Sequence, residues 1–229
     1  MVARKSMAAA PAEGKTLISV PPIEVQTVDV YVVGTSPLVM NRWSEKAKTM
    51  MRNKQQGVAQ QKREHKNPEE DFENAIHKMP DGRIGFPTIG FKAAAVTACT
   101  SAGGVKKTQA RQAFHINGDL AEIVGSEPEM REDMVRLHGM TADMRYRPQF
   151  SPWFTRLSIS YNTRALSLAE IVNLLNLAGF GVGVGEWRPE KDGGMGRFRV
   201  ATEDEAGEIQ RLLKANRPRK VMARKVAAE

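Results

Sequence analysis

The stretch WFTRLSISYNTRALSLAEIVNLLNLAG, residues 153–179, places a strand directly before a helix. In its first part, Leu157, Ile159 and Tyr161 alternate with polar residues. This spacing puts every second side chain on the same face, and it therefore predicts a strand that buries one side.

The second part of this stretch predicts a helix with a defined beginning and end. Ser167 can cap its first turn, Glu170 completes a capping box, and Gly179 ends the helix. Apolar residues at spacings of three and four fall on one face, which predicts that this face is buried. These residues are Ile171, Leu174, Leu175 and Ala178.

The sequence on either side supplies further strands and helices. Residues 23–34 alternate apolar and polar side chains and end in a β-branched run, which predicts a first strand. An alanine-rich helix is expected over residues 88–102, where a pair of glycines ends it. Strands are also expected within residues 113–124 and in residues 196–202, and a short amphipathic helix in residues 203–217.

The order strand, helix, strand, strand, helix, strand predicts an α+β fold of the ferredoxin-like or RRM-like type, a β-α-β-β-α-β palm with two helices on one face of an antiparallel sheet. The RNA-recognition module shares this order, and its open sheet face reads single-stranded bases. A polar, helix-forming insertion at 38–82 follows the first strand, and a second insertion at 126–152 separates the second and third strands. We expect the domain to span 23–202, after a flexible arm at 1–22 and before a helix and basic tail at 203–229.

The composition favours a soluble protein that binds a polyanion. The 229 residues carry a net charge of +8 and a sequence pI of about 9.7. Basic chains commonly bind nucleic acid, although a basic protein without such a partner has the same composition. Cys99 is the only cysteine, so no intramolecular disulfide can form. No run approaches the roughly 18 apolar residues of a membrane span, so we expect a cytoplasmic protein of a bacterial host cell.

Positive charge is concentrated in the first insertion. Between residues 42 and 66 eight basic residues, Arg42 and Lys46 among them, face only two acidic ones. The apolar content of this segment is too low for a core. Either it binds the polyanion or it is a solvated helical face that contacts nothing.

The glycine-rich stretch AGFGVGVGEWRPEKDGGMGRF, residues 178–198, does not match a nucleotide-cofactor loop. A dinucleotide fingerprint would need a glycine at Glu186 and a preceding strand, and the G-K-[ST] of a P-loop is absent. Two interpretations remain: a plain connection between helix and strand, or a surface where backbone N–H groups approach phosphates. The second one assigns backbone contacts to Gly181, Gly183 and Gly185, charge to Arg188, Lys191 and Arg197, and stacking to Trp187.

Two further sets of residues are candidates for strand binding. Lys92 lies in the first turn of an apolar helix, where N–H groups can hold a phosphate, unless it is simply a solvated lysine. The segment MRYRPQFSPWFTR, residues 144–156, interleaves arginines with aromatic rings as single-strand surfaces do. We expect Phe154 to be buried and Tyr146 and Phe150 to be exposed, with Arg145 and Arg147 beside them, although all the rings could belong to the core.

No metal or cofactor motif is present. The histidines lack metal-ligand spacing, and no C-x-x-C occurs. A metal-independent endoribonuclease could use one histidine as its general base. His138, with Asp143 nearby, and His115 are the candidates for that role, and an ordinary polar loop is the alternative.

Three segments resemble, in order along the chain, those of the RAMP superfamily, the RRM-like subunits of CRISPR effector complexes. They are VYVVGTSPLVMNRW (30–43), IGFPTIGFKAAAVTA (84–98) and GVGVGEWRPEKDGGMGRFRV (181–200). The resemblance implies an RRM-like palm with a helical insertion and a β-hairpin thumb, and subunits that polymerise along one RNA strand. It would place Lys92 and the loop from Gly181 to Gly196 along the strand backbone. The inserted EWRPEKDGG departs from the family and suggests a relative encoded by a phage or mobile element.

These observations lead to one expected function and two alternatives. We expect a non-catalytic protein that binds single-stranded RNA or DNA and assembles as a homo-oligomer, a filament or a multisubunit ribonucleoprotein. No cofactor, metal or membrane is expected. The alternatives are an endoribonuclease on the same fold and a phage protein whose basic face binds an acidic protein partner.

Overall fold

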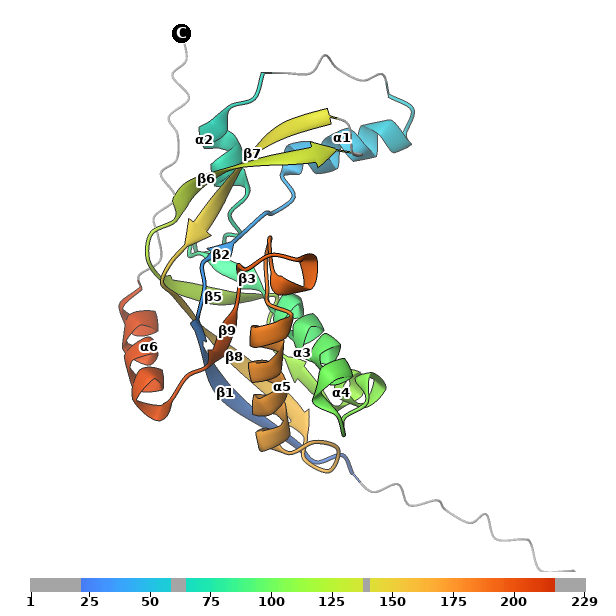
Figure 1. Ribbon diagram of the computed structural model, residues 1–229, viewed down its shortest axis with the longest axis vertical. Coiled ribbons are helices and arrows are strands. Elements are labelled where there is room, and N and C mark those ends of the chain that lie inside the picture. The colour runs from blue at the N-terminus through green and yellow to red at the C-terminus, as the bar shows by residue number, and fades with distance from the viewer. Residues whose placement is uncertain (1–21, 59–64, 138–140, 217–229) are drawn as a thin grey trace, which may run out of the picture.

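Within the residues that the structure describes, six α-helices combine with two antiparallel sheets, as the α+β prediction requires (Figure 1). The computed structural model describes residues 22–58, 65–137 and 141–216. The main sheet has the order β3-β5-β8-β1-β9, with β4 also pairing with β8. Its strands are β1 (Val25–Gly34), β3 (Gly85–Pro87), β4 (Phe114–Ile116), β5 (Leu120–Gly125), β8 (Trp153–Asn162) and β9 (Phe198–Val200).

The centre of the main sheet is the antiparallel pair of β1 and β8. Its register runs from Val25 opposite Asn162 to Val33 opposite Phe154. Because side chains alternate along a strand, the buried Val30 and Leu157, which lie opposite each other, point to the same face. The predicted strand at residues 153–162 is therefore confirmed, including its buried side.

Helices α3 (Thr88–Ala102) and α5 (Leu168–Gly181) pack against this buried face and against each other (Figure 1). The predicted capping box of α5 is confirmed, because Ser167 and Glu170 bond each other's backbone N–H groups. The predicted apolar face of α5 is buried throughout. Cys99 of α3 is buried as a small core residue.

Helix α6 (Glu203–Ala215) lies on the opposite side of the main sheet from α3 and α5 (Figure 1). Its Ile209 is buried, and so is Val124, a β5 residue on the outer face of the sheet. Arg199 pairs with Glu205 at 2.6 Å and thereby joins β9 to the helix. Part of the outer sheet face is therefore covered, which the sequence did not indicate.

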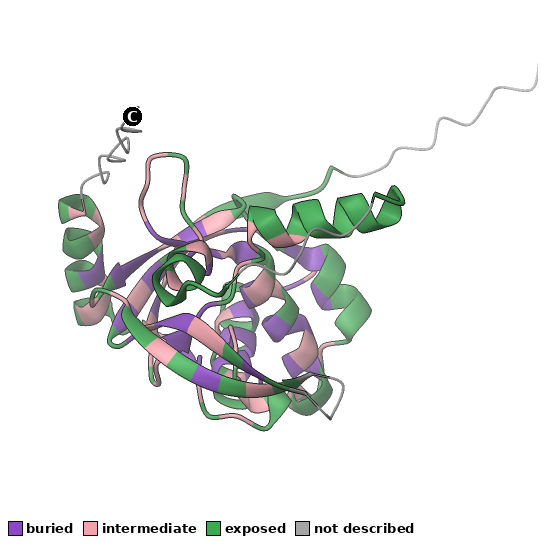
Figure 2. Ribbon diagram, turned by 90° about the horizontal axis from the view of Figure 1, so that it is seen from above, coloured by how far each residue is buried: buried purple, intermediate pink, exposed green. Residues whose placement is uncertain are grey.

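The segment between β5 and β8 forms a hairpin of β6 (Glu129–Leu137) and β7 (Thr141–Phe150). The base of β7 pairs with β2 (Leu38–Val39), so the second sheet has the order β2-β7-β6. Helices α1 (Glu45–Gln55) and α2 (Pro68–Asn74) precede β3. No residue of α1 is buried, and Figure 2 shows this helix as almost entirely exposed.

One prediction at the sheet edge needs correction, and two elements there were missed. The strand expected within residues 113–124 is divided into β4 and β5 by a turn, in which Gly118 has a φ of +80°. The preceding helix α4 (Lys107–Ala113) was not predicted, and neither was β3.

The expected arm at 1–22 lies outside the described residues up to residue 21, and the expected basic tail lies outside them from residue 217.

Candidate nucleic-acid interface

The glycine-rich segment after α5 folds back on itself and forms a closed loop. The N–H of Val184 donates to the carbonyl of Gly196 at 2.9 Å, and the N–H of Gly196 donates to the carbonyl of Pro37 at 2.7 Å. A short 3-10 helix, Pro189–Lys191, lies inside the loop. The sequence interpretation of a connection between helix and strand is therefore correct in position, but the connection is a compact structure.

The glycines of this loop allow close approach to the protein's own backbone. Gly185 and Gly196 have φ values of +79° and +65°. A Cβ at Gly185 would overlap the carbonyl oxygen of Val39, and one at Gly196 would overlap that of Val184. Gly183 also has a positive φ, whereas Gly181 does not, and a Cβ at Gly181 would meet no atom within 4 Å. Most of these glycines are thus required by the fold itself.

A cleft of about 460 Å³ separates this loop from the beginning of α3. Apolar side chains from α3 and from the loop form much of its lining, Ile89, Ala93 and Val184 among them. Its polar side chains come from four separate parts of the chain and are Asn41, His77, Thr97, Glu186, Arg188 and Glu190. No local sequence pattern joins these residues, which explains why the cleft was not predicted.

The polar edge of the cleft is not positively charged. Arg188 donates to Glu190 at 2.8 and 3.0 Å and to the carbonyl of Gly185 at 3.1 Å, so its charge is neutralised within the loop. Glu186 adds a second carboxylate. Burial, reinforced by nearby cations, lowers the pKa of His77 to about 4, so the imidazole is neutral at pH 7.

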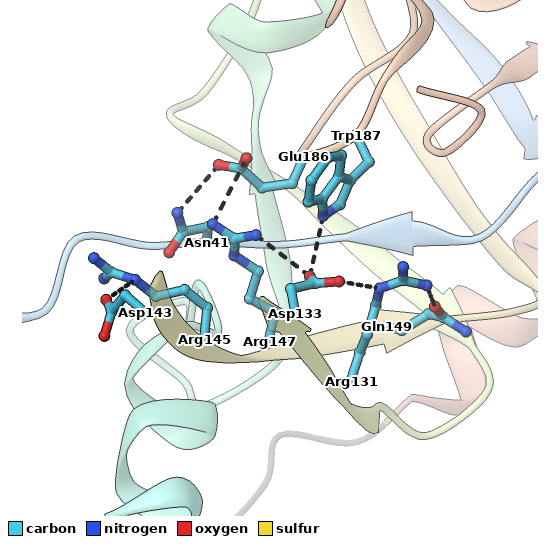
Figure 3. Close-up of polar contacts among 9 residues, drawn as sticks. All are labelled: Asn41, Arg131, Asp133, Asp143, Arg145, Arg147, Gln149, Glu186 and Trp187. Atoms are coloured by element: carbon cyan, nitrogen blue, oxygen red, sulfur yellow. Dashed lines mark hydrogen bonds and ion pairs between the residues drawn. The ribbon is translucent and has the colours of Figure 1, made fainter. Parts of the chain in front are cut away.

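A buried carboxylate joins the loop to the hairpin (Figure 3). The indole N–H of Trp187 donates to Asp133 at 3.0 Å, and Arg131 and Arg147 donate to the same carboxylate at 2.7 and 3.3 Å. Burial alone would raise the pKa of Asp133, but the hydrogen bonds from Arg131 and Trp187 outweigh it and lower that pKa. Trp187 itself has a φ of +54°, a left-handed conformation that is uncommon for a bulky residue.

Of the predicted arginines of the hairpin, Arg147 belongs to this network and Arg145 to a separate pair. Arg147 is only 7% exposed and also lies 4.0 Å from Glu186, beside Asn41 (Figure 3). Arg145 pairs with Asp143 at 2.8 Å, and Lys66 from the segment before α2 pairs with the same carboxylate. The structure therefore brings Arg147 and Trp187 together on the buried Asp133, while Arg145 pairs separately with Asp143.

The expected exposure of the aromatic residues is partly wrong. Phe150 is 1% exposed, because it ends β7 opposite the fully buried Leu38 and enters the core. Phe154, expected in the core, is half-buried on the outer sheet face, while its neighbour Trp153 is buried. Tyr146 is half-buried. Phe150 has no ring face available for a base, which removes it from the stacking candidates.

Lys92 does not point toward solvent at the beginning of α3. Its ammonium group donates to the carbonyls of Arg111, at 2.9 Å, and Phe114, and lies 4.7 Å from the centre of the Phe114 ring. Burial lowers its pKa. These contacts are made to α4 and to the strand that follows it, so an unpredicted element explains the unexpected orientation.

The other predicted residues lie further apart. Lys191 and Arg197 are exposed on the glycine-rich loop. Arg42 pairs with Glu45 at 3.2 Å at the beginning of α1, the helix that also carries the exposed Lys46. His115 is exposed on β4, whereas His138 lies outside the described residues.

Two kinds of feature are absent from the part of the chain that the structure describes. Within residues 22–58, 65–137 and 141–216, no group of three or more His, Cys, Asp or Glu side chains could hold a metal ion. Over the same ranges, no helix combines the length and the apolar character that crossing a membrane requires.

Comparison with known proteins gave structural likeness only. No protein-family model and no curated protein matches the chain. The crystal structure of Cmr6 from Pyrococcus furiosus is 10% identical, with a TM-score of 0.43, over 79% of this chain and 100% of that one. A chain in the cryo-EM structure of the Type III-B Cmr-beta bound to cognate target RNA is 11% identical, with a TM-score of 0.50. That likeness covers 78% of this chain but only 59% of the other. At this identity the second likeness shows that the two chains share a fold.

Proposed function

We propose that this chain is a non-catalytic subunit that binds single-stranded nucleic acid within a multisubunit ribonucleoprotein. The observation that carries the proposal is the fold that 78% of the chain shares with part of an assembly bound to target RNA. The net charge of +8 agrees with a polyanionic ligand, because neutralised phosphates release counterions.

The finer assignment is a ferredoxin-like, RRM-like palm carrying a thumb. The strand order β5-β8-β1-β9, with α3 between β1 and β5 and α5 between β8 and β9, supports the palm. The β6–β7 hairpin, inserted between β5 and β8, supports the thumb, and α1 and α2 form the helical insertion. In this assignment the palm spans residues 23–202.

Strand contacts are assigned to cations that lie on the surface near the loop and on α1. Phosphate contacts are assigned to Lys191, Arg197 and Lys46. Base stacking is assigned to Trp187, whose side chain is partly accessible in a residue that is 38% exposed. Arg145, Arg147 and Arg188 act by holding the hairpin and the loop in position, since their charges are paired with acids.

The proposal is tested by fluorescence anisotropy of the full-length protein with labelled single-stranded RNA and DNA of the same mixed sequence. Affinity should fall as salt rises, with a log–log slope of about −0.7 for each phosphate contacted. A slope near zero would contradict the proposal. Electron microscopy of the same mixtures reports whether copies assemble along the strand and which nucleic acid supports assembly.

A charge-reversal pair localises the contact. The double variant Lys191→Glu with Arg197→Glu should reduce affinity at least tenfold. It should also make the salt slope shallower by about one to two units, because fewer counterions are released when fewer phosphates are contacted. The matched control reverses two exposed cations of α4, Lys107→Glu with Arg111→Glu. Equal losses in both double variants would show only an effect of net charge.

A further inference from the structure

We propose that the cleft between the glycine-rich loop and α3 holds a single unstacked nucleobase that carries an exocyclic amine. The inference rests on the proposed strand-binding function and specifies a base-selective site within it. The occupant is one base of the bound strand, and the lining of the cleft determines its chemistry.

The size and the lining of the cleft suit a planar, mostly apolar group. Its volume of about 460 Å³ lies within the range of about 300–1,000 Å³ that is usual for small-ligand pockets. Ile89 is 71% exposed at its edge, and Ala93 is exposed along its wall. An unstacked base needs apolar surface to replace the contacts it lost in the strand. Exposed Ile89 and the small Ala93 provide such surface and leave room for the ring.

The charges around the cleft argue against a phosphate as the occupant. The side chains of Glu186 and Glu190 contribute two carboxylates, while the one arginine of the lining, Arg188, is bonded to Glu190 and to a loop carbonyl. The imidazole of His77 carries no charge at neutral pH. A neutral ligand with hydrogen-bond donors is therefore favoured over an anion.

Glu186 is positioned to select the base. One of its carboxylate oxygens accepts from the amide of Asn41 at 3.1 Å, while the other lies 4.0 Å from Arg147, too far for a hydrogen bond (Figure 3). An ionised carboxylate only accepts, so it pairs with the amines of cytosine, adenine or guanine. Uracil and thymine have no exocyclic amine, and their N3–H donor lies between two carbonyl oxygens that the carboxylate would repel.

The test measures base preference separately from strand binding. Unlabelled oligo(C), oligo(A) and oligo(U) of equal length compete with a labelled mixed-sequence RNA for the full-length protein. Wild type should prefer oligo(C) and oligo(A) over oligo(U) by about tenfold, the discrimination of one good base contact. Glu186→Gln, whose amide also donates, should reduce this ratio to about twofold or less.

A second variant fills the cleft without touching the core. Ala93→Phe should abolish the base preference, and the control Ala169→Phe, at an exposed alanine of α5, should keep it. Circular dichroism melting verifies that both variants fold. The base-site proposal is overturned if all three oligomers compete equally for wild type, or if the base preference survives Ala93→Phe. Either result would leave the proposal of nucleic-acid binding intact. Failure of wild type to bind any strand at low salt overturns both proposals.

Discussion

The sheet core and the junction between hairpin and glycine-rich loop are held together by opposite kinds of interaction. In the core, Phe91 packs edge-to-face against Phe86 and Phe198 and obliquely against Trp153, with ring centres 5.4 to 6.5 Å apart. In the junction, the carboxylate of Asp133 receives three hydrogen bonds from cationic and indole donors.

The two regions therefore contribute differently: the core to the free energy of folding, and the junction to the position of the hairpin. Apolar contacts scale with buried area and tolerate small shifts, so they supply most of the free energy of folding. Hydrogen bonds to a buried charge are directional and costly to leave unmade, so they fix the position of the hairpin relative to the loop. We therefore expect changes in the core to unfold the protein and changes in the junction to release the hairpin alone.

The largest effect is expected from Phe91→Ala. The side chain is fully buried, so its removal leaves a cavity among three rings and should lower the free energy of unfolding by about 3–5 kcal/mol. Urea denaturation followed by circular dichroism measures the loss. Phe180→Ala, at a position 77% exposed, is the control and should change stability by less than about 0.5 kcal/mol.

Removing the buried acid of the junction should have the next largest effect. Asp133→Ala leaves Arg147 buried without its main partner, which costs about 3 kcal/mol. Hydrogen exchange should show this loss in the amides of β6 and β7 and not in those of α3 and α5. Asp29→Ala, which breaks an exposed pair with Arg156, is the control. Uniform loss of protection in every element would contradict the separation of the two regions.

Two glycines of the loop provide a matched pair with a smaller effect. Gly196→Ala places a Cβ on the Val184 carbonyl at a φ of +65°, so it should cost at least about 1–2 kcal/mol. Gly194→Ala meets no atom within 4 Å and should be nearly neutral. Thermal melting compares the two. Equal melting temperatures would mean that the loop relaxes freely and is not a fixed structure.

The smallest effect concerns the ion pair that joins α6 to β9. Hydrogen bonds from Arg199 and from the Thr202 backbone lower the pKa of Glu205 to about 2. Because the folded pKa is below the ordinary value of 4.5, the stabilisation is present above pH 4.5 and is lost as pH falls toward 2. Exchange of the α6 amides should therefore accelerate over this range. Arg199→Gln should remove most of that dependence, and added salt should weaken it.

Elements with strong local signals could be predicted from the sequence. The bounds of α3 and β8 and the capping box of α5 follow from periodicity and capping residues within a few positions. Helix α4 was missed because no side chain caps it and because its buried Ala110 and Ala113 are recognisable only once the sheet is known. Local sequence patterns therefore predict the elements whose buried face is marked by their own periodicity and capping residues.

Much less of the candidate site could be predicted from sequence patterns. The burial of Phe150 depends on pairing with Leu38, more than one hundred residues away. The orientation of Lys92 depends on α4, and the cleft joins Asn41 and His77 to the loop after α5. The sequence placed Arg147 and Trp187 in two separate candidate sets, and only the fold shows that both donate to the buried Asp133.

The opposed directions of α3 and α5 have a further consequence for the cleft. Ile89 and Gly90 at the beginning of α3 and Val182 at the end of α5 line the same space. A helix carries roughly half a positive charge at its beginning and half a negative charge at its end, so the two helix dipoles largely cancel at this point. The two helix ends therefore add little net charge to the cleft, and its polarity is set mainly by the side chains of Glu186, Glu190 and Arg188.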